Sequence, residues 1–428
     1  DGAPDFPDDY IDFGRVISYK NTLLDTAYTR FARHATPDQH RAFERFCHEH
    51  AHWLDDVALF MALKEHYHLR PWHEWDPDLA HRRPEALAFW RDRLAERIRN
   101  QKYRQWQFFE QWLALKRYAN QRGIRIIGDI PLYVSLDSAD VWANPHLFHL
   151  DRDLNPTIVS GVPPDYFSAS GQLWGHPIYR WDLMEQDGYA WWIERFRAAF
   201  TQADTVRIDH FRGFYNYWEV PAGEETAING RWRYGPGAKL FHAVTKALGE
   251  VAIISEDLGE FDRESRAALD ALQAAFGYPG MEVLQFAFSG KPTNAYLPHN
   301  YTRECVVYTG THDNNTAVGW YRQATESERD FVRRYLGRDG SDIAWDLIRL
   351  AWSSVAHTAM TIAQDLLSLG AEARLNTPGT SGAPNWRWRL PPGALTDVIA
   401  HRLADLTFIY SRTTTPTAED AESPEEHE

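Results

Sequence analysis

Cysteine is scarce in this sequence, with only Cys47 and Cys305 among 428 residues. Two cysteines cannot build the disulfide framework of a small secreted domain, and they suit a reducing compartment. No apolar run approaches the length that crosses a bilayer, and no signal-peptide pattern is present. We therefore expect a cytoplasmic protein with no membrane partner.

Dense clusters of basic residues are also absent. The formal net charge is −15, and no Lys/Arg cluster could follow a phosphate backbone, so we expect no nucleic-acid partner. The loops GxGxxG and GxxxxGK[ST] do not occur, which implies no nucleotide cofactor. His48 and His52 have the i, i+4 spacing of some metal ligands, but no carboxylate motif accompanies them. We interpret them as a solvated helix face and expect neither a metal nor a cofactor.

Aromatic side chains are abundant, with 18 Trp, 20 Tyr and 22 Phe. A large core uses many of them, because aromatic side chains bury much apolar area. Exposed aromatic planes, in contrast, stack against the C–H faces of sugar rings. Composition does not choose between these uses, but clustering beside polar loops favours sugars, and the loop-rich segment 135–181 holds such a cluster.

The order of periodic segments predicts an α/β protein with a parallel sheet. Predicted strands at 125–134, 205–211, 251–259, 281–288 and 305–316 alternate with predicted helices at 189–200, 238–249 and 265–277. We expect strand 125–134 to be buried, and a long helix to carry Leu347, Val355 and Leu366 before closing at Gly370. The predicted domains are a mostly helical subdomain (1–122), a barrel strand (123–134), a loop-rich subdomain (135–200), the remaining barrel (201–410) and a disordered acidic tail (411–428).

Three predicted strands end in a carboxylate: Asp209 in RIDHF, Glu256 in IISEDLG and Asp313 in THDNN. In parallel barrels the active site lies at the carboxyl ends of the strands. Arg207 precedes Asp209 by two residues, so both side chains share one face, where the guanidinium holds the carboxylate ionised. Any one of these acids, taken alone, is explained as well by a structural role, as a helix N-cap or as a partner in a loop ion pair. Three acids at strand ends favour catalysis.

Such a set of acids supports chemistry at a glycosidic bond. Retaining enzymes use a nucleophilic carboxylate and a proton-donating carboxylic acid about 5–5.5 Å apart, and a third carboxylate can stabilise developing charge. The acids could instead bind Mg²⁺ or Ca²⁺. The basic neighbours Arg207 and His312 favour acid–base chemistry over a cation site.

Six motifs closely resemble the 4-α-glucanotransferases called amylomaltase or disproportionating enzyme, glycoside hydrolase family 77. They are GDIPLYVSLDSADVW, PPDYFSASGQLWGHPIYRW, RIDHFRG, ISEDLG, TGTHDNNT and LNTPGTSGAPNWRWR, and the resemblance runs from about Asp9 to Leu390. It implies a (β/α)8 TIM barrel with inserted helical and loop-rich subdomains. It also implies retaining transfer of α-1,4-glucan segments between maltooligosaccharides and starch- or glycogen-derived glucans, through a covalent glycosyl-enzyme intermediate.

The resemblance assigns a role to each acid. Asp209 resembles the nucleophile, Glu256 the general acid and base, and Asp313 the group that stabilises the transition state by binding sugar hydroxyls. Among the substrate-binding residues that it implies, Arg207 resembles the arginine that orients the nucleophile. The others are His312, Asp129, Tyr166, Phe167 and Trp174. For Asn385, a contact to the donor sugar and a structural turn both remain open, and the same holds for Asn314 and Asn315.

The N-terminus departs from the family pattern, which ordinarily begins with the first barrel strands. The opening DYIDFGRVISYK resembles the family after those strands, so we expect the first one or two of the eight strands to be missing from this chain.

Three other functions remain open. An α-glucan hydrolase would release more free glucose per bond cleaved. A non-catalytic glucan-binding protein would result if the missing strands abolish turnover. A metal-dependent barrel enzyme would lose activity in a chelator.

Overall fold

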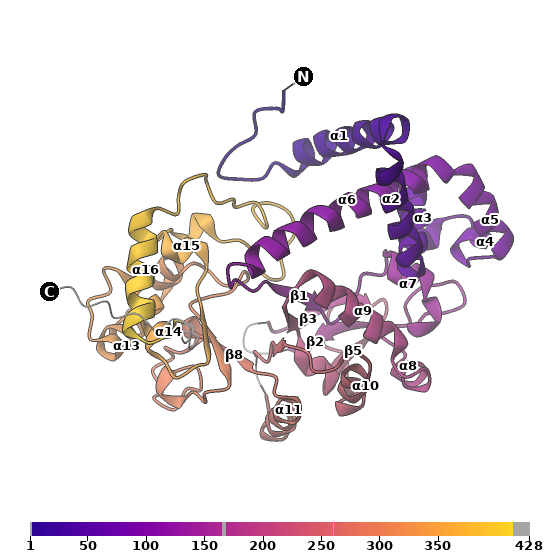
Figure 1. The fold of residues 1–428 in the computed structure, drawn as a ribbon. Helices are drawn as coiled ribbons and strands as arrows, with labels where there is room; N and C mark the ends of the chain where they lie inside the picture. Colours follow the sequence, from indigo (N-terminus) through magenta and orange to yellow (C-terminus); the bar gives the residue numbers. More distant parts are fainter. Residues whose placement is uncertain (1, 165–167, 260, 414–428) are drawn as a thin grey trace. The chain divides into compact units, whose positions relative to one another are not determined.

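The computed structural model describes residues 2–164, 168–259 and 261–413. The chain divides into two compact units, which are described separately below. Figure 1 shows the ribbon with its helices and strands labelled. The large unit is Ile17–Gly280, and the small unit is Asp1–Val16 with Met281–Glu428. Among the described residues, no helix is both long enough and apolar enough to cross a membrane.

The N-terminal region is helical, as predicted. Its helices are α1 (Phe13–His34), α2 (Pro37–Glu49), α3 (Ala51–His66), α4 (Pro77–Ala80), α5 (Pro84–Arg93) and the long α6 (Ala95–Asn120). Local sequence fixes the start of α2: Thr36 and Gln39 cap each other's backbone N–H groups, and Pro37 occupies the first turn. In the large unit an aromatic core that includes Phe43 and Trp106 joins α1, α2, α3 and α6.

A parallel sheet follows in the large unit. Its strands are β1 (Ile127–Pro131), β4 (Thr205–Asp209) and β7 (Ile253–Ser255), in the order β1-β4-β7. Helices α9 (Ala190–Gln202), α10 (Ala238–Leu248) and α11 (Arg263–Phe276) alternate with the strands, as the sequence predicts. The prediction that strand 125–134 is buried is wrong, because β1 is an edge strand of the described sheet and Ile127 is 38% exposed.

The loop-rich segment contributes to a second sheet, which the sequence analysis did not predict. Its strands are β2 (Ile158–Val162), β3 (Gln172–Pro177), β5 (Asn216–Pro221) and β6 (Arg231–Tyr234), antiparallel in the order β3-β2-β5-β6. The short helices α7 (Ala139–Ala143) and α8 (Trp181–Gln186) complete this region. The large core beneath it includes Trp142, Trp192 and Phe211, all fully buried.

The small unit contains strands β9 (Cys305–Tyr308) and β10 (Thr358–Met360), which pair in parallel. Strand β8 (Gly280–Val283) lies on the other side of β9, and the division between the two units falls after its first residue. Its helices are α12 (Ala317–Gln323), α13 (Glu326–Leu336), α14 (Ile343–Ser353), α15 (Ala363–Leu366) and α16 (Asp397–Ile409). The predicted long helix ending at Gly370 is wrong, because the chain leaves α14 after Ser353 and enters β10. Pairing of Thr358–Met360 with β9 overrides the helical spacing of the apolar residues.

Both cysteines are free thiols in the structure. Cys47 is partly buried and Cys305 is buried. Burial raises the pKa of the Cys47 thiol to about 11.

Candidate active site

Two carboxylates share one guanidinium at the carboxyl end of the parallel sheet. Arg207 Nη1 donates to Asp129 Oδ2 at 2.8 Å and to Asp209 Oδ1 at 3.2 Å. The register places Asp129 beside Arg207 on the neighbouring strand. Val206 and Ile208 point the other way and are fully buried, which confirms the alternation predicted for β4. Arg207 thus holds both carboxylates in a fixed orientation.

Glu256 follows strand β7 at the same level. Ile208 on β4 pairs with Ser255 on β7. The next residues along the chain, Asp209 and Glu256, therefore lie at the carboxyl ends of neighbouring strands. Glu256 Oε2 accepts from the His210 N–H at 2.7 Å, and Oε1 accepts from the Leu258 N–H at 3.1 Å. Burial, then the Asp209 charge, raises the pKa of Glu256 to about 7, against the opposing effect of Arg207. Near neutral pH Glu256 can therefore hold or release a proton.

His210 connects these two acids and was not predicted. Its backbone adopts φ 53°, in the left-handed region, a conformation that costs free energy in residues other than glycine and clusters at active sites. This turn aims its N–H at Glu256. Its ring meets Trp174 edge-on at 4.8 Å between centroids. Burial lowers the pKa of His210 to about 4, so the imidazole is neutral above that pH.

The Glu256 segment is anchored by helix α11. Asp257 is 5% exposed and accepts from Arg266 Nη2 at 2.9 Å and from Gln273 Nε2 at 3.1 Å. Gln273 also donates to Ser255 Oγ at 2.7 Å. Bonds on both sides of Glu256 therefore fix the backbone that carries it.

In the small unit, Asp313 lies in the loop that follows β9, and the prediction that it ends a strand is wrong because β9 ends at Tyr308. Its Oδ1 accepts from Asn376 Nδ2 at 2.6 Å, and its backbone carbonyl accepts from Arg374 Nη2 at 2.7 Å. His312 Nε2 is 3.4 Å from Asp313 Oδ2. The Asp313 side chain remains 39% exposed, and a ligand can reach it.

Asn376 and Trp386 were not predicted as site residues. Both lie in the motif LNTPGTSGAPNWRWR, but nothing in the sequence shows that this motif returns to Asp313. The Trp386 ring packs against His312 at 5.4 Å between centroids and is 48% exposed, with φ 60°. An exposed aromatic ring in a strained backbone next to an acid suits stacking against a sugar.

Other predicted residues take part in local structure or lie elsewhere. Asn385 bonds within its own loop: Oδ1 accepts from the Thr377 N–H at 3.0 Å and Nδ2 donates to Thr380 Oγ1 at 2.8 Å. Asn314 Oδ1 accepts from Thr311 Oγ1 at 2.8 Å, as a turn residue would. Tyr166 and Phe167 lie outside the described residues. The structure thus groups Asp129, Arg207, Asp209 and Glu256 in the large unit, and His312 with Asp313 in the small unit.

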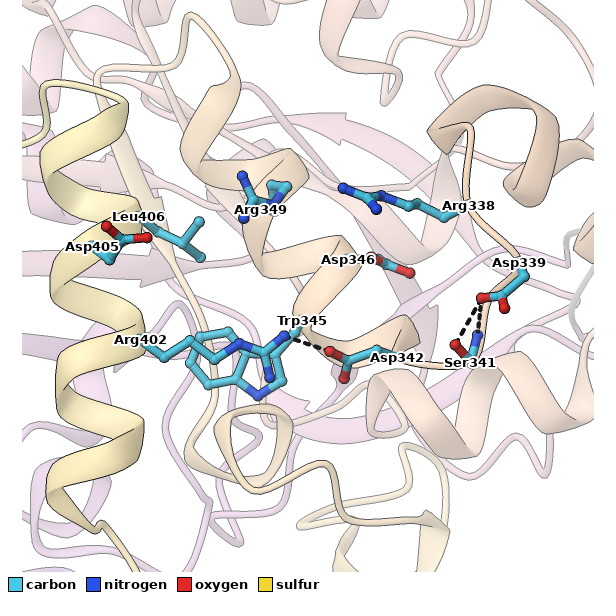
Figure 2. A pocket seen from close by; sticks show the side chains of 10 residues that line it. All are labelled: Arg338, Asp339, Ser341, Asp342, Trp345, Asp346, Arg349, Arg402, Asp405 and Leu406. Carbon is cyan, nitrogen blue, oxygen red and sulfur yellow. Dashed lines mark hydrogen bonds and ion pairs between the residues drawn. The ribbon is translucent and has the colours of Figure 1, made fainter.

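A pocket of about 320 Å³ opens in the small unit along α14 and α16. Figure 2 shows its lining, in which Arg402 lies over the Trp345 ring and pairs with Asp342. None of the predicted site residues lines it.

Comparisons with known proteins agree on one family. Residues 3–396 match the family model for glycoside hydrolase family 77, described as 4-alpha-glucanotransferase. The chain is 47% identical over 416 residues to a 4-alpha-glucanotransferase of Synechocystis sp., covering 96% of this chain and 81% of that one. It is 47% identical over 408 residues to the enzyme of that name from Thermus thermophilus, covering 94% and 81%.

A solved structure has the same fold. An amylomaltase from Streptococcus agalactiae in complex with acarbose matches with a TM-score of 0.91 and 38% identity, over 96% of this chain and 82% of that one. The predicted α/β TIM-barrel class is confirmed by this likeness. The expected absence of the first barrel strands stays a prediction.

Proposed function

Because the chain belongs to the 4-alpha-glucanotransferases of glycoside hydrolase family 77, we propose a mechanism in which Asp209, Glu256 and Asp313 carry its reaction. The reaction is the retaining transfer of α-1,4-glucan segments from a donor to an acceptor. One observation supports the assignment most directly: Asp209 is held by a guanidinium, whereas Glu256, at the end of the neighbouring strand, is partly buried with a raised pKa. An ion-paired carboxylate next to a carboxyl of raised pKa suits a nucleophile and an acid.

In the first step, an Asp209 carboxylate oxygen attacks C1 of the donor sugar. The bond between C1 and the glycosidic oxygen breaks, and Glu256 transfers its proton to that oxygen, which leaves with the released glucan. A covalent glucosyl ester on Asp209 remains. Arg207 orients the nucleophile by its bond to Asp209 Oδ1.

In the second step, a sugar hydroxyl of the acceptor attacks C1. Glu256, now a carboxylate, takes the hydroxyl proton, and the ester bond to Asp209 breaks. Both acids return to their starting states, and the two inversions retain the anomeric configuration. Asp313, held by Asn376, binds sugar hydroxyls and stabilises the developing positive charge.

The remaining predicted contacts surround the sugar. We assign Asp129 and His312 to hydrogen bonds with the donor glucose, Trp174 to stacking, and Tyr166 and Phe167 to a cover over the acceptor. Aromatic cover that excludes water lets a sugar hydroxyl compete for the intermediate, which favours transfer over hydrolysis. The substrates are then maltooligosaccharides and starch- or glycogen-derived glucans. Two free thiols suit a cytoplasmic location.

The test is incubation with maltotriose and chromatography of the products. The wild-type chain is expected to produce glucose and longer maltooligosaccharides. Asp209→Asn should reduce this by at least about a thousandfold, because no ester can form. Asp153→Asn, which changes a surface carboxylate that is 71% exposed, is the matched control. Glucose accumulating without longer products would favour the hydrolase, and a wild-type chain that binds glucan without products would favour the non-catalytic binder.

A further inference from the structure

An aromatic surface is exposed along the edge strand β6. Tyr234 is 75% exposed and Trp232 is 38% exposed. The antiparallel register places Trp218 opposite Trp232 and Asn216 opposite Tyr234, so these side chains share one face of the sheet. The alternate residues Arg231 and Arg233 point to the other face, where both donate to Glu219. We call Tyr215, Trp218, Trp232 and Tyr234 the β6 platform.

The rings of the β6 platform are held in fixed positions. Trp218 meets Trp232 at 5.3 Å between ring centroids, and Tyr215 meets Tyr234 at 5.8 Å, each pair near perpendicular. Trp218 Nε1 donates to the Ala227 carbonyl at 2.9 Å. Gly230 lies against the Trp218 indole so closely that a Cβ there would be 2.1 Å from it. Rings fixed in this way lose little conformational entropy when a ligand binds.

The platform is joined to the segment that carries the nucleophile. Arg212, in the short helix η3 (Phe211–Phe214) just after Asp209, lies 4.0 Å from the centroid of Trp232 and 4.5 Å from that of Phe261. The Gly235 N–H donates to the Tyr215 carbonyl at 2.8 Å. A Cβ on Gly235 would be 2.4 Å from the Phe214 carbonyl oxygen, so the chain leaving β6 packs directly on the η3 backbone.

We propose that the β6 platform binds glucose residues of the α-1,4-glucan that lie away from the cleaved bond. This inference rests on the proposed function. The exposed ring surfaces of Tyr234 and Trp232 offer apolar planes for the C–H faces of glucose. Because Arg212 links the platform to the segment that follows Asp209, only a long glucan can occupy Asp209 and the platform at once. The platform therefore sets a preference for longer glucans.

The test compares maltoheptaose with maltotriose as the substrate. In Trp232→Ala and Tyr234→Ala, the ratio of kcat/KM for maltoheptaose to that for maltotriose is expected to fall about tenfold, as loss of one stacked ring implies. Retention of the protein in native gels that contain glycogen should fall in parallel. Tyr234→Phe, which keeps the ring, should restore most of both. Phe89→Ala removes another exposed aromatic side chain, 57% exposed on α5, and serves as the matched control.

The outcomes separate the two proposals. Platform variants that keep the wild-type ratio and the wild-type retention would overturn the platform. A wild-type chain that transfers no glucan would overturn the proposed function instead. In that case, loss of glycogen retention in Trp232→Ala and Tyr234→Ala, but not in Phe89→Ala, would still support the platform.

Discussion

Asp209 and Glu256 end neighbouring strands but have different surroundings. Asp209 accepts a hydrogen bond from Arg207, and its side chain is 45% exposed. Glu256 accepts from two backbone N–H groups, yet burial and the Asp209 charge dominate and raise its pKa. The first of the two steps needs Asp209 ionised and Glu256 protonated. The residue that limits activity at alkaline pH is therefore Glu256.

The pH dependence of kcat/KM tests this assignment. Because the pKa of Glu256 is raised to about 7, the acid is protonated below that pH and loses its proton above it. We expect kcat/KM for maltotriose to fall about tenfold per pH unit above about pH 7. Asp257→Asn should shift this fall in kcat/KM to lower pH, since the Asp257 charge contributes to the raised pKa of Glu256. An activity that stays constant up to pH 9 would contradict the role of Glu256 as the acid.

At the scale of elements, the loop that carries Asp313 depends on one buried carboxylate. Asp365, at α15, is fully buried. Its Oδ2 accepts from Thr309 Oγ1 at 2.7 Å and its Oδ1 accepts from the Ala317 N–H at 2.8 Å. Gln285 Nε2 supports the same loop by donating to the Asn315 carbonyl at 2.7 Å. Hydrogen bonds to the buried side chains of Asp365 and Gln285 therefore fix both ends of the loop that carries Asp313.

Replacing Asp365 should weaken both stability and catalysis. In Asp365→Asn, one of the two buried donors loses its acceptor, so we expect the free energy of unfolding to drop by about 1–3 kcal/mol. Urea denaturation measures that drop, and kcat should fall because Asp313 is less well positioned. Asp330→Asn, whose parent side chain is 52% exposed on α13, should change stability by less than about 0.5 kcal/mol. An Asp365→Asn variant as stable and as active as that control would show that the loop holds its shape without this carboxylate.

Sequence patterns predicted which segments form helices and strands better than they predicted which segments pack or pair with one another. The alternation in β4 predicted that Arg207 and Asp209 share a face, and β4 ends at Asp209 as predicted. The predicted ends of the next strands were too late, because β7 ends at Ser255 and β9 ends at Tyr308. The helix expected to run to Gly370 failed because spacing cannot show that residues 358–360 pair with β9. The antiparallel sheet was missed for the same reason, since β2 and β5 are far apart in sequence. Contacts such as Asn376 with Asp313 depend on the fold and have no local signal.

At the scale of the whole molecule, the proposed chemistry uses carboxylates of the chain itself. Across the part of the chain that the structure describes, no group of three or more His, Cys, Asp or Glu side chains is arranged to hold a metal ion. His48 and His52 fall in different helices, α2 and α3, so their i, i+4 spacing does not lie on one helical face.

Treatment with a chelator tests whether the reaction depends on a metal ion. We expect dialysis against EDTA to leave the rate of maltotriose disproportionation within about twofold of the untreated rate, since general acid and nucleophilic catalysis by carboxylates need no Lewis acid. Dialysis without EDTA is the control. A loss of activity that added Ca²⁺ or Mg²⁺ restores would favour the metal-dependent alternative.

The two free thiols make this chain a convenient host for site-directed chemical probes. Cys305 is buried, and the Cys47 thiol, with its pKa raised to about 11, is almost entirely protonated at neutral pH. Thiol-selective reagents attack the thiolate, so neither native cysteine competes well for them. A single cysteine introduced at an exposed position could then be labelled with a fluorophore or a spin label in the otherwise unaltered sequence, without first removing the native cysteines.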